Sequence, residues 1–582
     1  MKKVIFSLQK QRASLHVVSI VVIVLLAVML RFILMNMHWP VANADESIMD
    51  LMARHVLYQG EHPIFFWGQD HMGTIQAYLG ALFMGFYGSS AFSVRLGTLL
   101  LFALYIICIY FLVCLLYTPR YALFITALLS IGGDRAMSVP LVANGGYAET
   151  MLFAALIFLL ASWLALSTPR RRTPVRGVRI LAYAGLGYVV GLALWSDQLV
   201  LAAVFTAGLL LGICCWSELR SRASGALLLG LLLGAAPLIA YNLSAPLEQN
   251  SLIVLIGTTF SGLPRTIPVW QEMLQALLIA LPLATSMPFI SGNPTVCSNS
   301  EPYTQQVHHL TDFFPGSNAW ACLGTHGIWS LTILLVWFLA FAGAVLALRQ
   351  LRKTNQEISV GQNEPVVWRQ RSVQYARLML LSSAALWLLL FAFSAGGQWT
   401  PRGSSRYLIC LLLAVPAVLW PLWQSLSHVR ARVKLGQRFA SSRFIFSAML
   451  LSALVASYLV GLVSTVATLS DDQSAYKHVN TLIATLLNHG VTRFYSDYDT
   501  CSLLIFQSNE QVICSVLDTQ LQPGMNRYNP YVVQVTAATH PAYLFPVNSP
   551  EDQKLAQNIG QDEYYRHLII EGDSIYYYVG GS

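Results

Sequence analysis

Residues 15–50 read LHVVSIVVIVLLAVMLRFILMNMHWPVANADESIMD, an apolar run followed at once by a short polar segment. The run from 15 to 37 is long enough to cross the roughly 30 Å of hydrocarbon in a bilayer as a helix. A pair of carboxylates, Asp45 and Glu46, comes directly after it. Carboxylates are costly to hold against hydrocarbon, so a pair at this position serves chemistry at the membrane surface more readily than packing. The stretch predicts a membrane protein with a candidate site just beyond its first span.

The composition supports the same class. The chain has 582 residues, of which 55% are hydrophobic and 11% charged, and its mean hydropathy is +0.56. So few charges cannot cover a soluble surface. We expect a polytopic α-helical membrane protein with about eleven transmembrane helices, interfacial helices and a small C-terminal α/β domain. The apolar runs that predict these helices lie at 15–37, 92–116, 120–133, 149–167, 178–196, 198–215, 225–242, 328–348, 375–395, 406–426 and 444–466.

The basic residues predict an orientation. Most of the 35 Lys and Arg residues fall in segments that are cytoplasmic if the N-terminus is inside, as the positive-inside rule requires. The formal charge of +8 is therefore a topology signal and does not call for nucleic acid as a partner. The first run is long and lacks a small-residue cleavage site, so it is expected to remain as an anchor. We expect a multi-pass protein of the plasma membrane with a cytoplasmic N-terminus and an exterior C-terminal domain.

Four cysteines lie outside the apolar runs: Cys297, Cys322, Cys501 and Cys514. Proximity favours the disulfides 297–322 and 501–514, although four cysteines allow three pairings. A zinc site is the competing interpretation, but no CxxC or HxxxH spacing supports it.

The chain divides into a membrane domain, 1–466, and a small exterior α/β domain, 467–582. Within the first domain, 38–91 and 243–327 are long exterior loops. In the first loop, Ser47 followed by Asp50 resembles a capping box and predicts an amphipathic interfacial helix that ends at Gly60.

Further elements are expected at the following places. The stretch 75–87 is too short to span a membrane and predicts a second interfacial helix, and 270–284 predicts a helix in the second loop. The C-terminal domain is expected to hold a helix at 480–487, strands at 493–496, 511–517, 531–536 and 543–547, and a closing hairpin formed by 564–571 and 574–579 around Gly572-Asp573.

Polar residues gather in the exterior loops and at the membrane edge. They are Asp45, Glu46, Asp70 and His71; Asp134, Arg135, Asn144, Tyr147 and Glu149; Asp197; and Arg402, Arg406 and Tyr407. Consecutive exterior hairpins would place them on one membrane face, with carboxylates and arginines around one cavity. Transfer of a sugar from a lipid phosphate needs such a set, because a base takes the acceptor proton and cations stabilise the departing phosphate.

The acidic pair after the first span, the run Gly85-Phe-Tyr-Gly-Ser-Ser-Ala-Phe-Ser-Val-Arg95-Leu before the second, and Arg406-Tyr407 opening a late span resemble the GT-C glycosyltransferases. The protein O-mannosyltransferase and aminoarabinose transferase branch is the most similar. The likeness covers about 15–425 and implies an inverting glycosyltransferase that uses a polyprenyl-phosphate sugar donor and an exterior lipid, glycan or protein acceptor.

The resemblance also implies roles for single residues. It makes Asp45 the catalytic base and places Arg406 and Tyr407 at the donor phosphate. From their positions in the sequence alone, Glu46 and Glu149 are further catalytic candidates, and Arg402 is a further candidate for the donor phosphate. Residues that could line the site are Asp70, His71, Asp134, Arg135, Tyr147 and Asp197. The chain departs from the family at Gln69-Asp70-His71-Met72-Gly73, where relatives often have a basic residue or His ahead of prolines.

Other interpretations stay open. Several of these residues could act as helix caps, exposed ion pairs or lipid-headgroup anchors. Asp45 with Asp134 or Glu149 could hold Mg²⁺ or Mn²⁺, although no ligand spacing demands a metal. His55, His308 and His309 are expected to be solvated. At the level of the whole chain, a transporter or flippase of a lipid-linked substrate and a non-catalytic envelope assembly or receptor protein are the alternatives.

Overall fold

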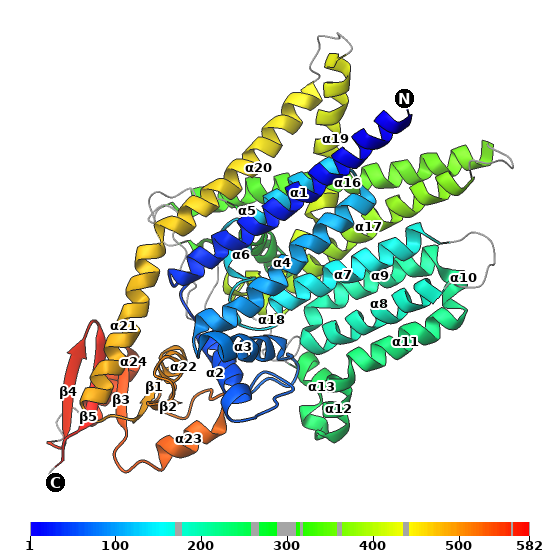
Figure 1. Ribbon diagram of the computed structural model, residues 1–582. Helices are drawn as coiled ribbons and strands as arrows, with labels where there is room; N and C mark the ends of the chain where they lie inside the picture. The colour runs from blue at the N-terminus through cyan, green and yellow to red at the C-terminus, as the bar shows by residue number, and fades with distance from the viewer. Residues whose placement is uncertain are drawn as a thin grey trace. The chain divides into compact units, whose positions relative to one another are not determined.

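The computed structural model of the chain describes residues 2–168, 177–257, 267–287, 310–314, 318–357, 364–434, 442–559 and 563–580 (Figure 1). By their internal contacts the residues form two compact units. The helical unit comprises Met1–Leu30, Leu100–Pro140 and Tyr147–Val466. The mixed unit comprises Arg31–Leu99, Leu141–Gly146 and Ala467–Ser582, so that the first loop and the C-terminal residues belong to one unit.

In the described residues, eight helices are long and apolar enough to cross a membrane, or nine if a pair bent by 62° is one span. The eight are Leu15–Asn36, Ala91–Leu116, Tyr147–Leu166, Gly177–Ser196, Ala319–Lys353, Val366–Ala392, Gly403–Ser427 and Phe444–Asn488, and the bent pair is Arg222–Gly234 with Ala236–Ser244. The predicted runs at 120–133 and 198–215 fall on shorter apolar helices, Pro119–Ile131 and Gln198–Cys214. Every predicted run thus coincides with a helix, and the chain is an integral membrane protein.

Several of these helices extend beyond their apolar part, and short helices lie between them. The bounds along the helical unit are α1 Lys2–Asn36, α4 Ala91–Leu116, α5 Pro119–Ile131, α6 Asp134–Ser138, α7 Tyr147–Leu166, α8 Gly177–Ser196, η1 Gln198–Val200, α9 Leu201–Cys214, α10 Trp216–Leu219, α11 Arg222–Gly234, α12 Ala236–Ser244, η2 Leu247–Gln249, α13 Ser251–Ile256, α14 Val269–Gln275, the π-helix η4 Ala276–Ala280, α15 Leu281–Ala284, η5 Leu310–Phe313, α16 Ala319–Glu357, α17 Glu364–Ala392, α18 Ala395–Trp399, the 3-10 helix η6 Gly403–Ala414, α19 Val415–Lys434 and α20 Ser442–Ala467.

Glycine spacing fixes one helix pair of the helical unit. Helices α8 and α11 run alongside each other (Figure 1), and glycines four residues apart face the partner on both. A Cβ at Gly187 would lie 2.0 Å from the carbonyl oxygen of Leu227, and a Cβ at Gly230 would lie 2.0 Å from that of Ala184. The two backbones are therefore in direct contact, as small residues allow in membranes, where packing drives helix association.

The mixed unit begins with the helices of the first loop, α2 Ala44–Tyr58 and α3 Ile75–Tyr87. The start predicted for α2 was wrong. Asn43 is the N-cap, and its side chain accepts a hydrogen bond from the backbone of Glu46, so the acidic pair lies in the first turn instead of preceding the helix. Negative charges in the first turn interact favourably with the positive end of the helix dipole.

The burial of α2 is more extensive than its amphipathic pattern predicts, and its place at the membrane interface stays a prediction. Ile48, Leu51 and Met52 are buried as expected, but Met49 on another side of the helix is buried as well. Helix α2 packs against α3 and against α22, Tyr498–Gln507, of the C-terminal residues. Its apolar face therefore contacts protein, and the helix is part of the core of the mixed unit.

The C-terminal residues form a five-stranded sheet with the strand order β2-β1-β3-β5-β4. β1 pairs in parallel with β2 and β3, whereas β5 pairs antiparallel with β3 and β4. The bounds are α21 Leu469–Asn488, β1 Arg493–Ser496, α22 Tyr498–Gln507, β2 Ile513–Val516, α23 Asn529–Thr536, β3 Ala542–Pro546, α24 Pro550–Asn558, β4 Tyr565–Ile570 and β5 Asp573–Tyr578. The predicted helix at 480–487, the closing hairpin and three of the four other strands are confirmed.

The strand predicted at 531–536 was wrong. The β-branched run there forms helix α23, which starts with proline in its first turn and buries Tyr531 and Val535. Residues four apart share one face of a helix, so this spacing suits packing against β2. Helices α22 and α24 were not predicted.

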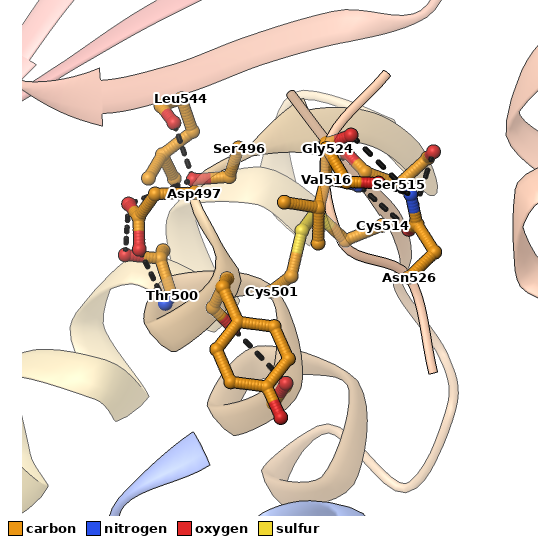
Figure 2. The surroundings of a disulfide bond; sticks show 12 residues. Ser496, Asp497, Thr500, Cys501, Cys514, Ser515, Val516, Gly524, Asn526 and Leu544 are labelled. Atoms are coloured by element: carbon orange, nitrogen blue, oxygen red, sulfur yellow. Dashed lines mark hydrogen bonds between the residues drawn. A yellow bond between two sulfur atoms is a disulfide. The ribbon is translucent and has the colours of Figure 1, made fainter. Parts of the chain in front are cut away.

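The disulfide between Cys501 and Cys514 is confirmed and ties α22 to β2 (Figure 2). Side chains around it close the neighbouring turns: Asp497 caps α22 through Thr500, and Asn526 accepts the backbone N–H of Val516. Cys322 lies in α16, whereas Cys297, His308 and His309 lie outside the described residues.

Candidate functional site

Asp45 lies in the first turn of α2 and contacts residues from the far end of the chain. Its Oδ1 accepts a hydrogen bond from the Tyr498 hydroxyl at 2.9 Å and one from Arg527 Nη2 at 3.3 Å. Arg527 Nε in turn donates to the Tyr498 oxygen at 2.9 Å. The three side chains form a closed triangle in which Asp45 remains partly open, with 24% of its side chain exposed.

The loop that holds Phe66 and Gly68, between α2 and α3, packs on Arg527. The guanidinium lies 5.1 Å from the ring centre of Phe66. Gly68 adopts φ +70°, and a Cβ there would lie 3.3 Å from Arg527 Cδ, so glycine suits both the turn and the close approach. Burial, and then the charge of Asp45, raise the pKa of Tyr498, which keeps the phenol as a hydrogen-bond donor.

Asp70 and His71 belong to this same loop. Burial lowers the pKa of His71; Asp70 opposes this effect, and the charge of Arg527 adds to it. The two predicted lining residues are therefore near the Asp45 triangle, and His71 is neutral at physiological pH.

Glu46 points elsewhere. Its carboxylate is fully buried and binds Arg95 through two hydrogen bonds of 2.6 Å, and Oε1 also accepts the backbone N–H of Ala143 at 3.4 Å. This bidentate pair joins α2 to α4 and to the segment Leu141–Gly146. Asp50 is buried beside it, and burial followed by the charge of Glu46 raises the pKa of Asp50 well above its usual value. From these contacts we expect Glu46 to hold the mixed unit together rather than to contact reacting atoms.

His55 is not solvated, contrary to the sequence-based expectation, and its exposed fraction is 1%. It lies between two carboxylates, 3.1 Å from Glu61 and 3.0 Å from Glu510, and Tyr531 donates to the same Glu510 oxygen. Burial alone would lower the pKa of His55, but its bonds to Glu510 and Glu61 raise it. Burial would raise the pKa of Glu510, but the bonds from His55, Tyr531 and Arg54 lower it to about 2. The network joins α2 to the C-terminal residues.

In the helical unit, Arg406 and Tyr407 lie in η6, close to the start of α7. The Arg406 guanidinium is 5.7 Å from the ring centre of Tyr147 and 5.8 Å from that of Tyr407. The two rings are themselves 5.9 Å apart. These distances bring the three predicted residues into one cluster. The aromatic faces attract the positive charge of the guanidinium.

The other predicted residues of the helical unit have structural contacts as well. Arg135 donates to the backbone carbonyl of Arg402 at 3.4 Å, which brings these two residues together. Glu149 lies fully buried in the first turn of α7. Asp197 caps η1 by accepting the backbone N–H of Leu199 at 2.8 Å. Asp134 begins α6.

The described residues contain no group of three His, Cys, Asp or Glu side chains arranged to hold a metal ion. Asp45 has a phenol and a guanidinium beside it, and a guanidinium has no lone pair for a cation. The charge of Asp45 also contributes to raising the pKa of Asp499, after burial and the charge of Asp497, so a second carboxylate is nearby. No step below depends on a metal ion.

No family model matches the sequence, and no curated protein matches it. The structure is similar to the crystal structure of ArnT from Cupriavidus metallidurans bound to undecaprenyl phosphate, with a TM-score of 0.55, 13% identity, and 96% of this chain and 97% of that chain covered. It is also similar to the apo oligosaccharyltransferase from Archaeoglobus fulgidus, with a TM-score of 0.52, 13% identity, and 95% and 73% of the two chains covered. The chain therefore shares the fold of these two proteins, which is the fold that the sequence resemblance to GT-C glycosyltransferases led us to expect.

In this chain the first-loop carboxylate is Asp45 and the late Arg-Tyr pair is Arg406-Tyr407. Tyr498 and Arg527, whose side chains bond Asp45, were not predicted from the sequence. They lie 453 and 482 residues beyond it, in a segment whose sequence carries no motif, so no local signal could have identified them.

Proposed function

We propose that this protein is a membrane glycosyltransferase that transfers one sugar from a polyprenyl-phosphate donor to an exterior hydroxyl acceptor. The observation that carries the proposal is the partly open carboxylate of Asp45 after the first span, held by Tyr498 and Arg527 in a chain with the GT-C fold. The ArnT structure to which this chain is similar was bound to undecaprenyl phosphate, which supports the donor class.

In the proposed reaction, Asp45 is the general base. It takes the proton of the acceptor hydroxyl while the acceptor oxygen attacks the anomeric carbon. The bond between that carbon and the phosphate oxygen breaks, and its electron pair leaves with polyprenyl phosphate. Phosphate is a good leaving group, so one carboxylate suffices. Because the acceptor displaces the phosphate in a single step, the configuration of the anomeric carbon inverts.

Two sets of side chains support Asp45 in this scheme. Tyr498 and Arg527 orient the carboxylate, and so act as positioning residues. Arg406 would neutralise the donor phosphate, with Tyr407 beside it; Arg402 and Glu149 remain candidates for the same site. That Asp45 and Arg406 meet at one cavity remains a prediction from the sequence.

The test uses the full-length protein in liposomes with a panel of radiolabelled undecaprenyl-phosphate monosaccharides as donors and lipids, glycans and proteins with free hydroxyls as acceptors. A positioned base contributes about 10²- to 10⁴-fold, so Asp45→Asn should lower turnover by at least that order and leave donor binding largely intact. Asp518→Asn, in a turn of the C-terminal residues, is the matched control. Transfer by Asp45→Asn at the unmutated rate would move the base elsewhere, and no transfer from any donor would contradict the proposal.

A further inference from the structure

The mixed unit contains a cavity of about 420 Å³ that the proposed reaction does not use. Its walls come from the end of α1, the start of α4, and the helices α2, α21 and α22. Every lining residue belongs to the mixed unit. The volume is within the roughly 300–1,000 Å³ of small-molecule sites.

This cavity is not the Asp45 site. Asp45 does not line it, whereas Ser47 on the same helix does. Two residues along a helix differ in direction by about 200°, so these side chains point to opposite sides of α2. On α22, Asp45 contacts Tyr498 in the first turn, while the cavity is lined by Leu503 and Phe506 in later turns.

Two hydroxyls in the wall have no hydrogen-bond partner within the described part of the chain. They are the Oγ atoms of Ser47 and Ser89, and both atoms are buried. Ser47 is 1% exposed. A buried hydroxyl without a partner costs free energy. Rotation of either side chain to another staggered rotamer would bring its hydroxyl to a ligand in the cavity and recover that free energy.

The charges of the wall are already compensated. Arg95 forms a bidentate ion pair with Glu46, and the carboxylate of Asp472 also interacts electrostatically with Arg95. His478 lies between Glu571 and Asp573. Burial, and then the charge of Arg95, lower the pKa of His38, so this ring is neutral at pH 7. A phosphate headgroup would need an uncompensated cation, which this wall does not offer; a neutral polar ligand needs none.

An aromatic pair completes the wall. The His38 and Tyr476 rings stack with their centres 3.8 Å apart. An aromatic side chain combines an apolar face with a polar tip, which matches a sugar, whose C–H groups form apolar faces and whose hydroxyls lie at its edge. Gln507 adds an amide, which can both donate and accept.

We propose that this cavity is a carbohydrate-binding site for a neutral sugar unit, separate from Asp45. The hydroxyls of Ser47 and Ser89 would bond the edge of the sugar, and the Tyr476–His38 pair would contact its face. The inference stands on the mixed unit alone and does not depend on the proposed transfer.

The test is saturation-transfer difference NMR on the full-length protein in nanodiscs, with methyl glycosides of glucose, mannose and N-acetylglucosamine as probes and glycerol phosphate as the anionic competitor. We expect at least one glycoside to bind. Tyr476→Ala should weaken that binding roughly three- to tenfold by removing the stacked face. Ser89→Leu, at a half-buried position, should fill the cavity and abolish the signal. The matched control is Ser474→Leu, because Ser474 is exposed on α21 and does not line the cavity.

The thermal midpoint of each variant reports folding, and two substitutions on separate elements guard against misfolding of either one. Weaker binding by Tyr476→Ala and no binding by Ser89→Leu, with the control unchanged, support the site. The proposal is overturned if no glycoside binds, if both cavity variants bind as the unmutated protein does, or if glycerol phosphate displaces the sugar at equal concentration, which would indicate a lipid-headgroup site.

Discussion

The Tyr498 hydroxyl donates a hydrogen bond to Asp45 Oδ1 at 2.9 Å across 453 residues of sequence. A hydrogen bond to a charged group contributes about 1.5–3 kcal/mol. If it orients the base, Tyr498→Phe should lower kcat at least about tenfold and leave the donor KM and the thermal midpoint nearly unchanged. Tyr495→Phe removes the hydroxyl of a partly buried tyrosine on β1 and is the control. Equal kcat for Tyr498→Phe and the unmutated protein would remove Tyr498 from the mechanism.

Arg406 is predicted to act on the donor rather than on the acceptor. A cation that meets phosphate in both the ground and the transition state affects binding as well as rate. Arg406→Ala should therefore raise the donor KM and lower kcat, and Arg406→Lys should restore part of the loss. Steady-state kinetics with varied donor give both constants. Arg352→Ala, at an exposed position on α16, should change neither; a purely kcat effect of Arg406→Ala would argue against phosphate binding.

Glu46 should prove structural. Removing one partner of a buried ion pair leaves the other charge uncompensated and typically costs about 3–5 kcal/mol. Glu46→Gln should therefore lower the thermal midpoint strongly, because the charge of Arg95 would stay buried without its counter-ion. Glu248→Gln, at an exposed position, should not lower it. Differential scanning fluorimetry measures both. A stable but inactive Glu46→Gln protein would instead return Glu46 to the catalytic candidates.

The glycines of α11 offer a comparison within one helix. Gly230→Ala places a Cβ within 2.0 Å of the Ala184 carbonyl oxygen and should force α8 and α11 apart, at a cost of at least about 1–3 kcal/mol. Nothing lies within 4 Å of a Cβ at Gly225, so Gly225→Ala should be neutral or slightly stabilising. The fraction of monodisperse protein and its thermal midpoint in detergent test this difference. Equal behaviour of the two variants would contradict the close contact.

The pH dependence of stability should report on His55. The pKa of His55 is raised in the folded state. Its contribution to the free energy of unfolding is therefore complete below about pH 6.5, and it is lost as the pH rises through the pKa of the folded state. Glu510, with a folded pKa of about 2, contributes above about 4.5 and loses its contribution toward pH 2.

The network should therefore stabilise most between about pH 4.5 and 6.5. We expect the thermal midpoint to fall by a few degrees from pH 6 to pH 9, about 2–4 °C for each kcal/mol lost. His55→Gln should flatten this decline, and His489→Gln, at an exposed position, should not. A decline of the same size in His55→Gln would assign it to other groups.

Much of the fold followed from patterns that act over short distances. Each apolar run predicted a helix because roughly 20 apolar residues satisfy their own backbone in a bilayer only as a helix. The strand at 493–496 and the closing hairpin followed from alternation and from the Gly572-Asp573 turn. Proximity was enough for the disulfide between Cys501 and Cys514.

The errors have a common physical origin. The run at 531–536 has β-branched residues, but tertiary packing selected a helix that buries Tyr531 and Val535. The pattern of the first-loop helix predicted one buried face, whereas Met49 on another side is also buried in the core of the mixed unit. His55 looked exposed because its partner Glu510 lies 455 residues away.

The sequence by itself determined the membrane class, the helices and the carboxylate that begins α2, because hydropathy and capping are set by neighbouring residues. Only the tertiary structure decided what each carboxylate does. Asp45 meets Tyr498 and Arg527, whereas its neighbour Glu46 meets Arg95, because adjacent residues on a helix point about 100° apart and encounter different segments of the folded chain. Those segments are hundreds of residues or a whole loop away, and only packing brings them together.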